Sequence, residues 1–207
     1  MAAVITRQSE RLLNVLLFLI FGWGSWLALD SRLQAGLTIA EVSFIAQNLV
    51  FCTVLLLRSS QRELSSSFIG QGLALGAFFS GMGFLKLSIQ AAGPLAVVGQ
   101  GLIVAANLLA VVSLATLGRS FGILIARRKL KISGIYGLVR HPMYLSDLML
   151  RLGYVLMHPG MAVGLLLVLS IVLYCGRARW EEKFLSCNAD YVAYAKKVRW
   201  RFIPWIY

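Results

Sequence analysis

The stretch GIYGLVRHPMYLSD, residues 134–147, places an arginine, a histidine, a proline and a tyrosine together where an apolar run begins. Pro142 suits the first position of a helix, where its missing N–H is not needed. Arg140 and His141 would then stand at the helix entrance, beside unpaired backbone amides and the positive end of the helix dipole. This arrangement is typical of an anion-binding site.

Further polar side chains continue along the same run. Arg140, Tyr144, Asp147 and Arg151 are separated by four, three and four residues, so they share one face if the helix extends back through Arg140. Such a stripe is costly in an apolar helix unless it is paired or lines a cavity. Two interpretations stay open: an Asp147–Arg151 ion pair that helps two helices recognise each other, or the wall of a polar site.

A second polar cluster, RARWEEKFL, contains the adjacent carboxylates Glu181 and Glu182. Neighbouring helical residues point about 100° apart, so the two are not expected to share one proton. We expect one of them to face a site while the other pairs with Arg177 or Arg179. The alternative is a solvated helix end balanced by cations.

The composition decides which kind of structure must hold these groups. The chain has 207 residues, of which 59% are hydrophobic and 14% charged, and its mean hydropathy is +0.79. Side chains of this composition cannot all be buried in one water-soluble globule. We therefore predict an all-α integral membrane protein with about six transmembrane helices, each near the length a bilayer requires. The predicted spans are Leu12–Leu29, Leu37–Leu57, Ser67–Ser88, Pro94–Leu117, Pro142–Met157 and Gly160–Gly176.

The last two predicted spans are short and carry Asp147 and Arg151, which indicates a helical hairpin partly sheltered by protein. Gly72 and Gly76 have the spacing that lets two helix backbones approach closely. A net charge of +12 would suggest a nucleic-acid partner in a soluble protein, but here the cations gather in segments that six spans would leave on the cytoplasmic side. We therefore expect both termini in the cytoplasm, anionic membrane lipids as partners and no nucleic acid.

Two regions differ in character along the chain. Residues 1–117 are predicted to form a four-helix transmembrane region. Residues 118–207 are predicted to form a cofactor-binding catalytic region, comprising a cytoplasmic connector, the helical hairpin and an amphipathic C-terminal helical segment. The connector is too long for a simple turn between helices, which favours a functional role. The three cysteines are scattered and indicate neither a metal site nor a disulfide framework.

The combination of GIYGLVRHPMY, a hydrophobic hairpin and EE resembles the integral-membrane isoprenylcysteine carboxyl methyltransferases and their bacterial relatives, which include phospholipid N-methyltransferases. The segment LGRSFGILIARRKLKISGIY and the ending with Tyr191 and Tyr194 resemble the bacterial branch. The resemblance covers residues 117–204. It implies an active site on the cytoplasmic side of a bacterial inner membrane.

For such enzymes the cofactor is S-adenosylmethionine, held between the R-H-P-x-Y region and the E-E helix and closed by the C-terminal segment. The resemblance implies the following cofactor-binding residues: Gly134, Tyr136, Arg140, His141, Pro142, Tyr144, Glu181 and Glu182. Arg140 and Glu182 are expected to take part in catalysis. Asp147 or Glu182 would serve as a base if the acceptor must lose a proton.

The acceptor is expected to be lipophilic: a prenylated cysteine carboxylate is favoured, and a phospholipid amine is the alternative. Two departures from the family are a shorter spacing between EE and Tyr191, and CNADY in place of Phe-Gly-x-x-Tyr. Membrane steroid reductases share the architecture and use NADPH, but their R-H-P-N-Y pattern has an asparagine that RHPMY lacks. A non-enzymatic membrane protein would instead pair the polar stripe with Glu41 or Asn107.

Overall fold

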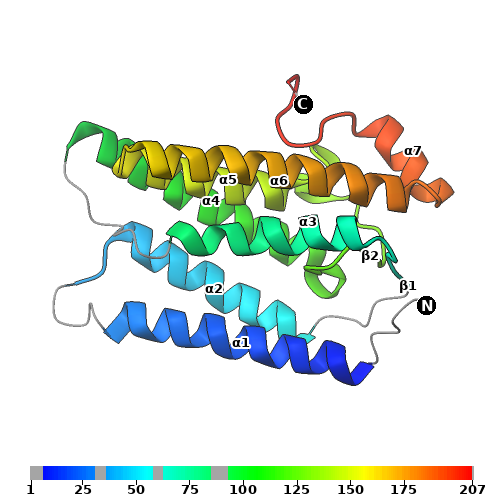
Figure 1. Ribbon diagram of the computed structural model, residues 1–207, viewed down its shortest axis with the longest axis horizontal. Helices are drawn as coiled ribbons and strands as arrows, with labels where there is room; N and C mark the ends of the chain where they lie inside the picture. The colour runs from blue at the N-terminus through cyan, green and yellow to red at the C-terminus, as the bar shows by residue number, and fades with distance from the viewer. Residues whose placement is uncertain (1–6, 31–35, 58–62, 85–92, 207) are drawn as a thin grey trace.

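The computed structural model describes residues 7–30, 36–57, 63–84 and 93–206. Within these ranges the chain folds into seven α-helices arranged as an elongated bundle (Figure 1). The helices are α1 (Arg7–Asp30), α2 (Ile39–Leu57), α3 (Phe68–Phe79), α4 (Pro94–Leu117), α5 (Pro142–Met157), α6 (Met161–Leu185) and α7 (Ala189–Lys197). The shorter elements are β1 (Glu63–Leu64), β2 (Ala126–Arg127) and the 3-10 turns η1 (Ser80–Phe84), η2 (Gly118–Ser120) and η3 (Gly134–Gly137).

Each of the six predicted spans overlaps a helix, although α1 and α6 extend beyond their predicted bounds and the end of the third span, Ser88, lies outside the described residues. Among the described residues, three helical stretches are long and apolar enough to cross a membrane: Ile39–Leu57, Pro94–Ser120 and Met161–Leu185. The prediction of a mainly helical membrane protein is therefore confirmed. Six crossings, the hairpin and the orientation of the chain stay predictions.

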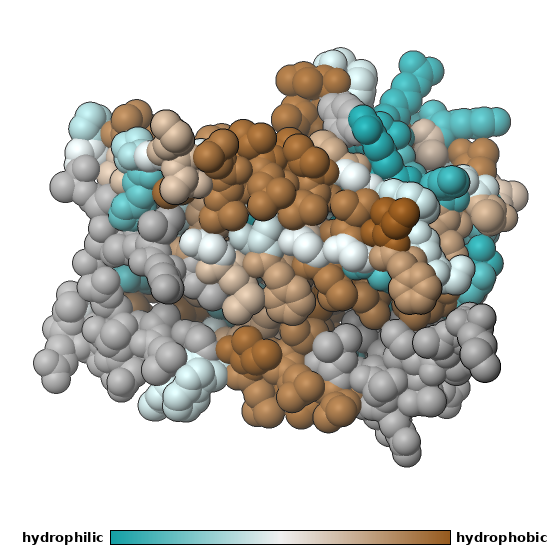
Figure 2. All heavy atoms as spheres, viewed as in Figure 1, coloured by the Kyte–Doolittle hydropathy of each residue, from teal (hydrophilic) through white to brown (hydrophobic). Residues whose placement is uncertain are grey.

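The surface exposes many large apolar side chains, as expected for a membrane protein. Large apolar side chains such as Phe68 and Met161 are 91% and 84% exposed, which water would penalise and lipid tails would not. Figure 2 shows apolar residues over the middle of the visible face, with hydrophilic residues gathered at the end where α7 and the C-terminus lie. The end of α6 that carries Glu181 and Glu182 lies at this polar end.

A close contact between α4 and α5 fixes the position of α5. A Cβ on Gly99 would lie 2.6 Å from the carbonyl oxygen of Gly153, and a Cβ on Gly153 would lie 2.8 Å from that of Gly99. Only glycine at both positions allows this approach. The predicted packing pair was wrong: among the described residues, a Cβ on Gly72 would meet nothing within 4 Å, and a Cβ on Gly76 would meet only the Leu173 side chain.

The connector between α4 and α5 is tied back to α3. Its strand β2 pairs antiparallel with β1, a two-residue ladder that the prediction of an all-α chain did not include. Next to it, the Gln71 side chain donates to the Ile125 carbonyl at 2.9 Å and accepts from the Ile125 amide at 3.1 Å. One side-chain amide thus satisfies both backbone groups of Ile125, which anchors the connector beside the site.

Candidate functional site

The entrance of α5 is held against the C-terminal segment. Pro142 occupies the first turn of α5, as the sequence predicted. The Arg140 amide donates to the Trp200 carbonyl at 2.9 Å, and the His141 amide donates to the Arg201 carbonyl at 2.8 Å. The amides that were expected to bind an external anion are therefore used, in part, by the chain itself.

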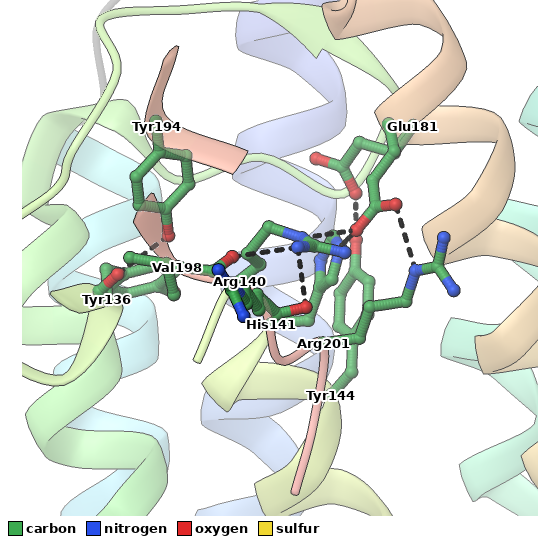
Figure 3. A network of polar contacts seen from close by, with 10 residues as sticks. Tyr136, Arg140, His141, Tyr144, Glu181, Tyr194, Val198 and Arg201 are labelled. Carbon is green, nitrogen blue, oxygen red and sulfur yellow. Dashed lines mark hydrogen bonds and ion pairs between the residues drawn. The ribbon is translucent and has the colours of Figure 1, made fainter. Parts of the chain in front are cut away.

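Arg140 precedes α5 and does not belong to its polar face, so the predicted four-residue stripe was wrong at its first member. Its guanidinium lies across the C-terminal segment (Figure 3). Nε donates to Glu182 at 2.8 Å, and Nη1 donates to the carbonyl oxygens of Val198 and Arg199 at 2.8 and 2.9 Å. Arg140 thus fastens the tail over the end of the bundle.

Glu182 completes this fastening. One carboxylate oxygen accepts from Arg140 and lies 3.0 Å from His141 Nε2, while the other accepts from Arg201 Nε at 2.9 Å. The expectation that one glutamate pairs with Arg177 or Arg179 was wrong for Glu182, because its partners come from α5's entrance and the tail. We call Arg140, Glu182 and Arg201 the clasp.

Glu181 takes a different direction, as the 100° offset between neighbouring helical residues requires. Its carboxylate accepts a hydrogen bond from the Tyr144 hydroxyl. The Arg177 guanidinium lies over the Tyr144 ring, 4.7 Å from its centroid, and donates to the carbonyl oxygens of Ile123 and Ala74. We call Tyr144, Glu181 and Arg177 the upper unit.

The same three residue types meet again further along α5. The Tyr174 hydroxyl donates to Asp147, and the Arg151 guanidinium lies 4.9 Å from the centroid of the Tyr174 ring. The two aromatic rings, Tyr144 and Tyr174, are neighbours with centroids 5.2 Å apart. We call Tyr174, Asp147 and Arg151 the deeper unit. The one-turn ion pair between Asp147 and Arg151 does not form in this described part of the chain.

Three tyrosines, Tyr136, Tyr191 and Tyr194, lie at the polar end of the bundle. The Tyr194 hydroxyl donates to the Tyr136 carbonyl at 2.7 Å, a contact visible in Figure 3. Tyr191 is 6% exposed, and its hydroxyl oxygen is buried without a hydrogen-bond partner. Burial raises the pKa of Tyr194 to about 12, so its hydroxyl stays a proton donor at neutral pH.

These groups surround one cavity of about 420 Å³, a volume within the usual range for small-molecule sites. Among the predicted site residues, those on its wall are Tyr136, Arg140, His141, Tyr144, Asp147 and Glu181. Gly134, Pro142 and Glu182 do not line it. Gly134 has a φ of +60° and packs against Thr116, while Pro142 begins α5 and Glu182 belongs to the clasp.

The cavity continues from its polar part into an apolar part between the helices. The polar part is lined by the upper unit, the three tyrosines and cationic side chains of the connector: Arg128, Lys129 and Lys131. The apolar part is lined by α1, α2, α3, η1 and α5, including Leu17, Phe21, Phe44, Phe51, Phe78 and Met143. The deeper unit contributes Asp147 and Arg151 to the same wall.

A family model described as phospholipid methyltransferase matches residues 88–188. Over these residues the chain is similar to the phospholipid methyltransferase family. The matched range contains α4, the connector, α5 and α6, and so includes both the RHPMY and the EE residues. No curated protein matches the chain.

The phospholipid methyltransferase match indicates an enzyme, a membrane methyltransferase, in agreement with the apolar helices. It ends before Tyr191, Tyr194 and the tail residues of the clasp. Sequence reasoning missed Tyr174 and Arg201 as members of the site, and it treated Arg177 only as a counter-ion. The spacing of Tyr174, Arg177 and Glu181, three and four residues apart on α6, was the available signal.

Proposed function

We propose that the chain transfers a methyl group from S-adenosylmethionine to a lipophilic acceptor. The observation that carries the proposal is the single cavity, whose polar part is lined by the family's motif residues and whose apolar part lies between helices. A charged nucleoside derivative suits the first part, and a lipid-soluble molecule suits the second. The two would meet without leaving the protein.

The residues on the polar wall fit such a cofactor. The buried Tyr191 hydroxyl has no partner, and a buried polar group of this kind requires one. The Glu181 carboxylate suits the cofactor's ammonium or ribose hydroxyls, and the ring of Tyr136 suits its adenine. Because Arg140 is engaged in the clasp, the cations available for the cofactor's carboxylate are those of the connector, Lys129 and Lys131.

S-adenosylmethionine, when bound, supplies an electrophilic methyl group on a sulfonium. Attack on such a carbon is an in-line displacement, so the protein's main contributions are orientation and exclusion of water. The clasp holds residues 198–201 over the polar end and thereby shields it. Glu182 is saturated by Arg140, His141 and Arg201, which makes it a positioning residue rather than a base.

Asp147 is then the carboxylate best placed to receive a proton from an acceptor, since it lines the cavity next to the upper unit. A carboxylate acceptor such as a prenylated cysteine needs no base, whereas a protonated amine or a hydroxyl does. The isoprenylcysteine-like carboxylate stays the sequence-based prediction and the phospholipid amine its alternative.

The proposal is tested by calorimetric titration of the full chain in detergent with S-adenosylhomocysteine. We expect saturable binding that Tyr191→Phe and Glu181→Gln weaken. Glu63→Gln is the matched control, because Glu63 pairs with Arg127 on the surface, away from the cavity. Binding of NADPH without S-adenosylhomocysteine would indicate a reductase, and binding of neither would indicate a non-enzymatic protein; each result would overturn the proposal.

A further inference from the structure

The deeper unit contains a buried cation whose hydrogen bonding is incomplete. Arg151 is 4% exposed, and its Nη2 donates to the Ala77 carbonyl at 3.1 Å. Its other terminal nitrogen, Nη1, is buried without a hydrogen-bond partner. Buried guanidinium donors are almost always paired, and Arg151 lines the cavity, so a group inside the cavity is the natural partner.

Asp147 supplies the complementary group. It lies one turn before Arg151 on α5, is only partly buried and lines the same cavity. One of its oxygens accepts from Tyr174, and a carboxylate has capacity for further donors. Both residues line the same cavity, and among the described residues one of them has an unpaired donor and the other a carboxylate acceptor.

The charges on this wall argue for a neutral partner. Asp147 and Arg151 carry opposite charges in a low-dielectric region, so their fields cancel for a ligand that approaches both. A carboxylate ligand would be attracted by Arg151 but repelled by Asp147, and an ammonium ligand would be attracted by Asp147 but repelled by Arg151. In either case the ligand's buried charge is poorly compensated. A hydroxyl both accepts and donates, and it adds no charge.

The surroundings argue that the rest of this partner is lipophilic. The wall of the cavity that the deeper unit lines also includes Phe44, Phe78, Met82 and Leu150. Along α5, Arg151 lies about 10 Å below Tyr144, since a helix rises 1.5 Å per residue. A polar group can reach this depth at low cost only as part of an apolar molecule.

We propose that Asp147 and Arg151 bind the hydroxyl group of a lipophilic alcohol, the methyl acceptor of this enzyme. Arg151 Nη1 donates to the hydroxyl oxygen, and the hydroxyl donates to Asp147. This inference rests on the proposed methyl transfer for its catalytic meaning. In that reaction the C–O bond forms, the methyl–sulfur bond of the sulfonium breaks, the hydroxyl proton passes to Asp147 and S-adenosylhomocysteine leaves.

A purely structural role for the deeper unit predicts a different behaviour. Tyr174 and Asp147 join α6 to α5, and Arg151 joins α5 to α3, so substitutions could act through stability alone. A change in stability would alter the binding of all lipophilic probes together. Selectivity between matched probes is therefore the readout that separates the two roles.

The test measures equilibrium binding of 1-dodecanol to the full chain in lipid nanodiscs, after the signal of empty nanodiscs is subtracted. Dodecyl methyl ether, dodecanoate and dodecylamine are then tested for their ability to displace 1-dodecanol. In the unmodified chain we expect 1-dodecanol to bind about tenfold more tightly than the ether, because the ether cannot donate to Asp147. Asp147→Asn should reduce this preference, since a neutral amide accepts more weakly than a carboxylate. Arg151→Met should weaken 1-dodecanol and the ether alike. Glu63→Gln is the control and should leave the alcohol preference unchanged, because Glu63 pairs with Arg127 and does not line the cavity.

The inference is overturned if the unmodified chain binds 1-dodecanol and the ether equally, if dodecanoate or dodecylamine binds more tightly than 1-dodecanol, or if Asp147→Asn keeps the full preference. S-adenosylhomocysteine is titrated into the same preparations. Binding of S-adenosylhomocysteine without an alcohol preference rejects this inference alone. An alcohol preference without S-adenosylhomocysteine binding rejects the proposed methyl transfer and leaves the hydroxyl site standing.

Discussion

The upper and deeper units use the same three parts, a tyrosine, a carboxylate that accepts from it and an arginine over a tyrosine ring. They differ in how their arginines are held. Arg177 uses both terminal nitrogens on backbone carbonyls of α3 and the connector, and its inner nitrogen Nε has no partner among the described residues. Arg151 uses one terminal nitrogen, and the other, Nη1, has no partner among them. The first arginine fixes the framework, and the second retains a donor for a molecule in the cavity.

The two units also differ in their distance from the clasp, which lies at the polar end of the bundle beside the upper unit. It joins the entrance of α5, the end of α6 and the tail through Arg140, Glu182 and Arg201. The deeper unit has no such cover and opens toward the apolar helices instead. Two similar clusters can thus serve a water-soluble cofactor and a lipid-soluble acceptor, because their surroundings differ.

The strongest way to separate the two units is to open the clasp. Arg140→Ala removes the bonds to the Val198 and Arg199 carbonyls, and Glu182→Ala leaves the largely buried Arg140 without its carboxylate, so each change loosens the hold on the tail. We expect affinity for S-adenosylhomocysteine to fall by about 100-fold or more. Calorimetric titration measures this loss, while binding of 1-dodecanol to the deeper unit should persist. Affinity equal to the unmodified chain in both variants would show that the clasp does not hold the cofactor end.

A second test compares the two arginines directly. Arg177→Met should lower the free energy of unfolding more than Arg151→Met, by about 2 kcal/mol, because it removes two charge-assisted hydrogen bonds to backbone carbonyls instead of one. Denaturant unfolding in mixed micelles provides the measurement. If Arg151→Met were the more destabilising change, the deeper unit would be the framework and the assignment of roles would be reversed.

The third test displaces α5, the helix that carries residues of both the upper unit and the deeper unit. Gly153→Ala should destabilise the protein by about 1–3 kcal/mol, since the new methyl group would meet the Gly99 backbone and push α5 away from α4. Gly72→Ala is the matched control, because a Cβ there meets nothing within 4 Å. Unfolding free energies of the two variants decide the point. A similar value for both would show that the α4–α5 contact does not fix the site.

The smallest expected effect concerns Tyr194, whose hydroxyl donates a hydrogen bond to the Tyr136 carbonyl at the polar end of the bundle. The pKa of Tyr194 rises from the ordinary 10.0 to about 12, so the folded state holds this proton more strongly than the unfolded state. Its stabilising contribution is therefore complete below pH 10 and is lost as the pH rises through about 12. Tyr194→Phe should cost about 1 kcal/mol at pH 8 and less at pH 11. A difference between Tyr194→Phe and the unmodified chain that stays constant between these pH values would contradict the assignment.

Local physics made much of the fold predictable. The apolar runs needed for a bilayer gave helices that overlap the predicted ranges, although α1 and α6 extend beyond theirs, and the ring of Pro142 placed the start of α5. The region 118–207 stays a predicted catalytic unit, and its connector was recognisable from its length and charge. The prediction failed where glycines had to be paired across helices, because Gly99 and Gly153 are far apart in sequence and neither carries a local signal.

The sequence by itself determined which residue types meet at the end of α5 and that Glu181 and Glu182 must diverge, because helix periodicity is a local property. Only the tertiary structure decided their partners. Arg140 lies 58 residues from the Val198 carbonyl that it holds, and Tyr174 lies 27 residues from Asp147. Hydrogen-bond partners at such separations depend on how helices pack, and packing is set by close contacts that no spacing along the chain records.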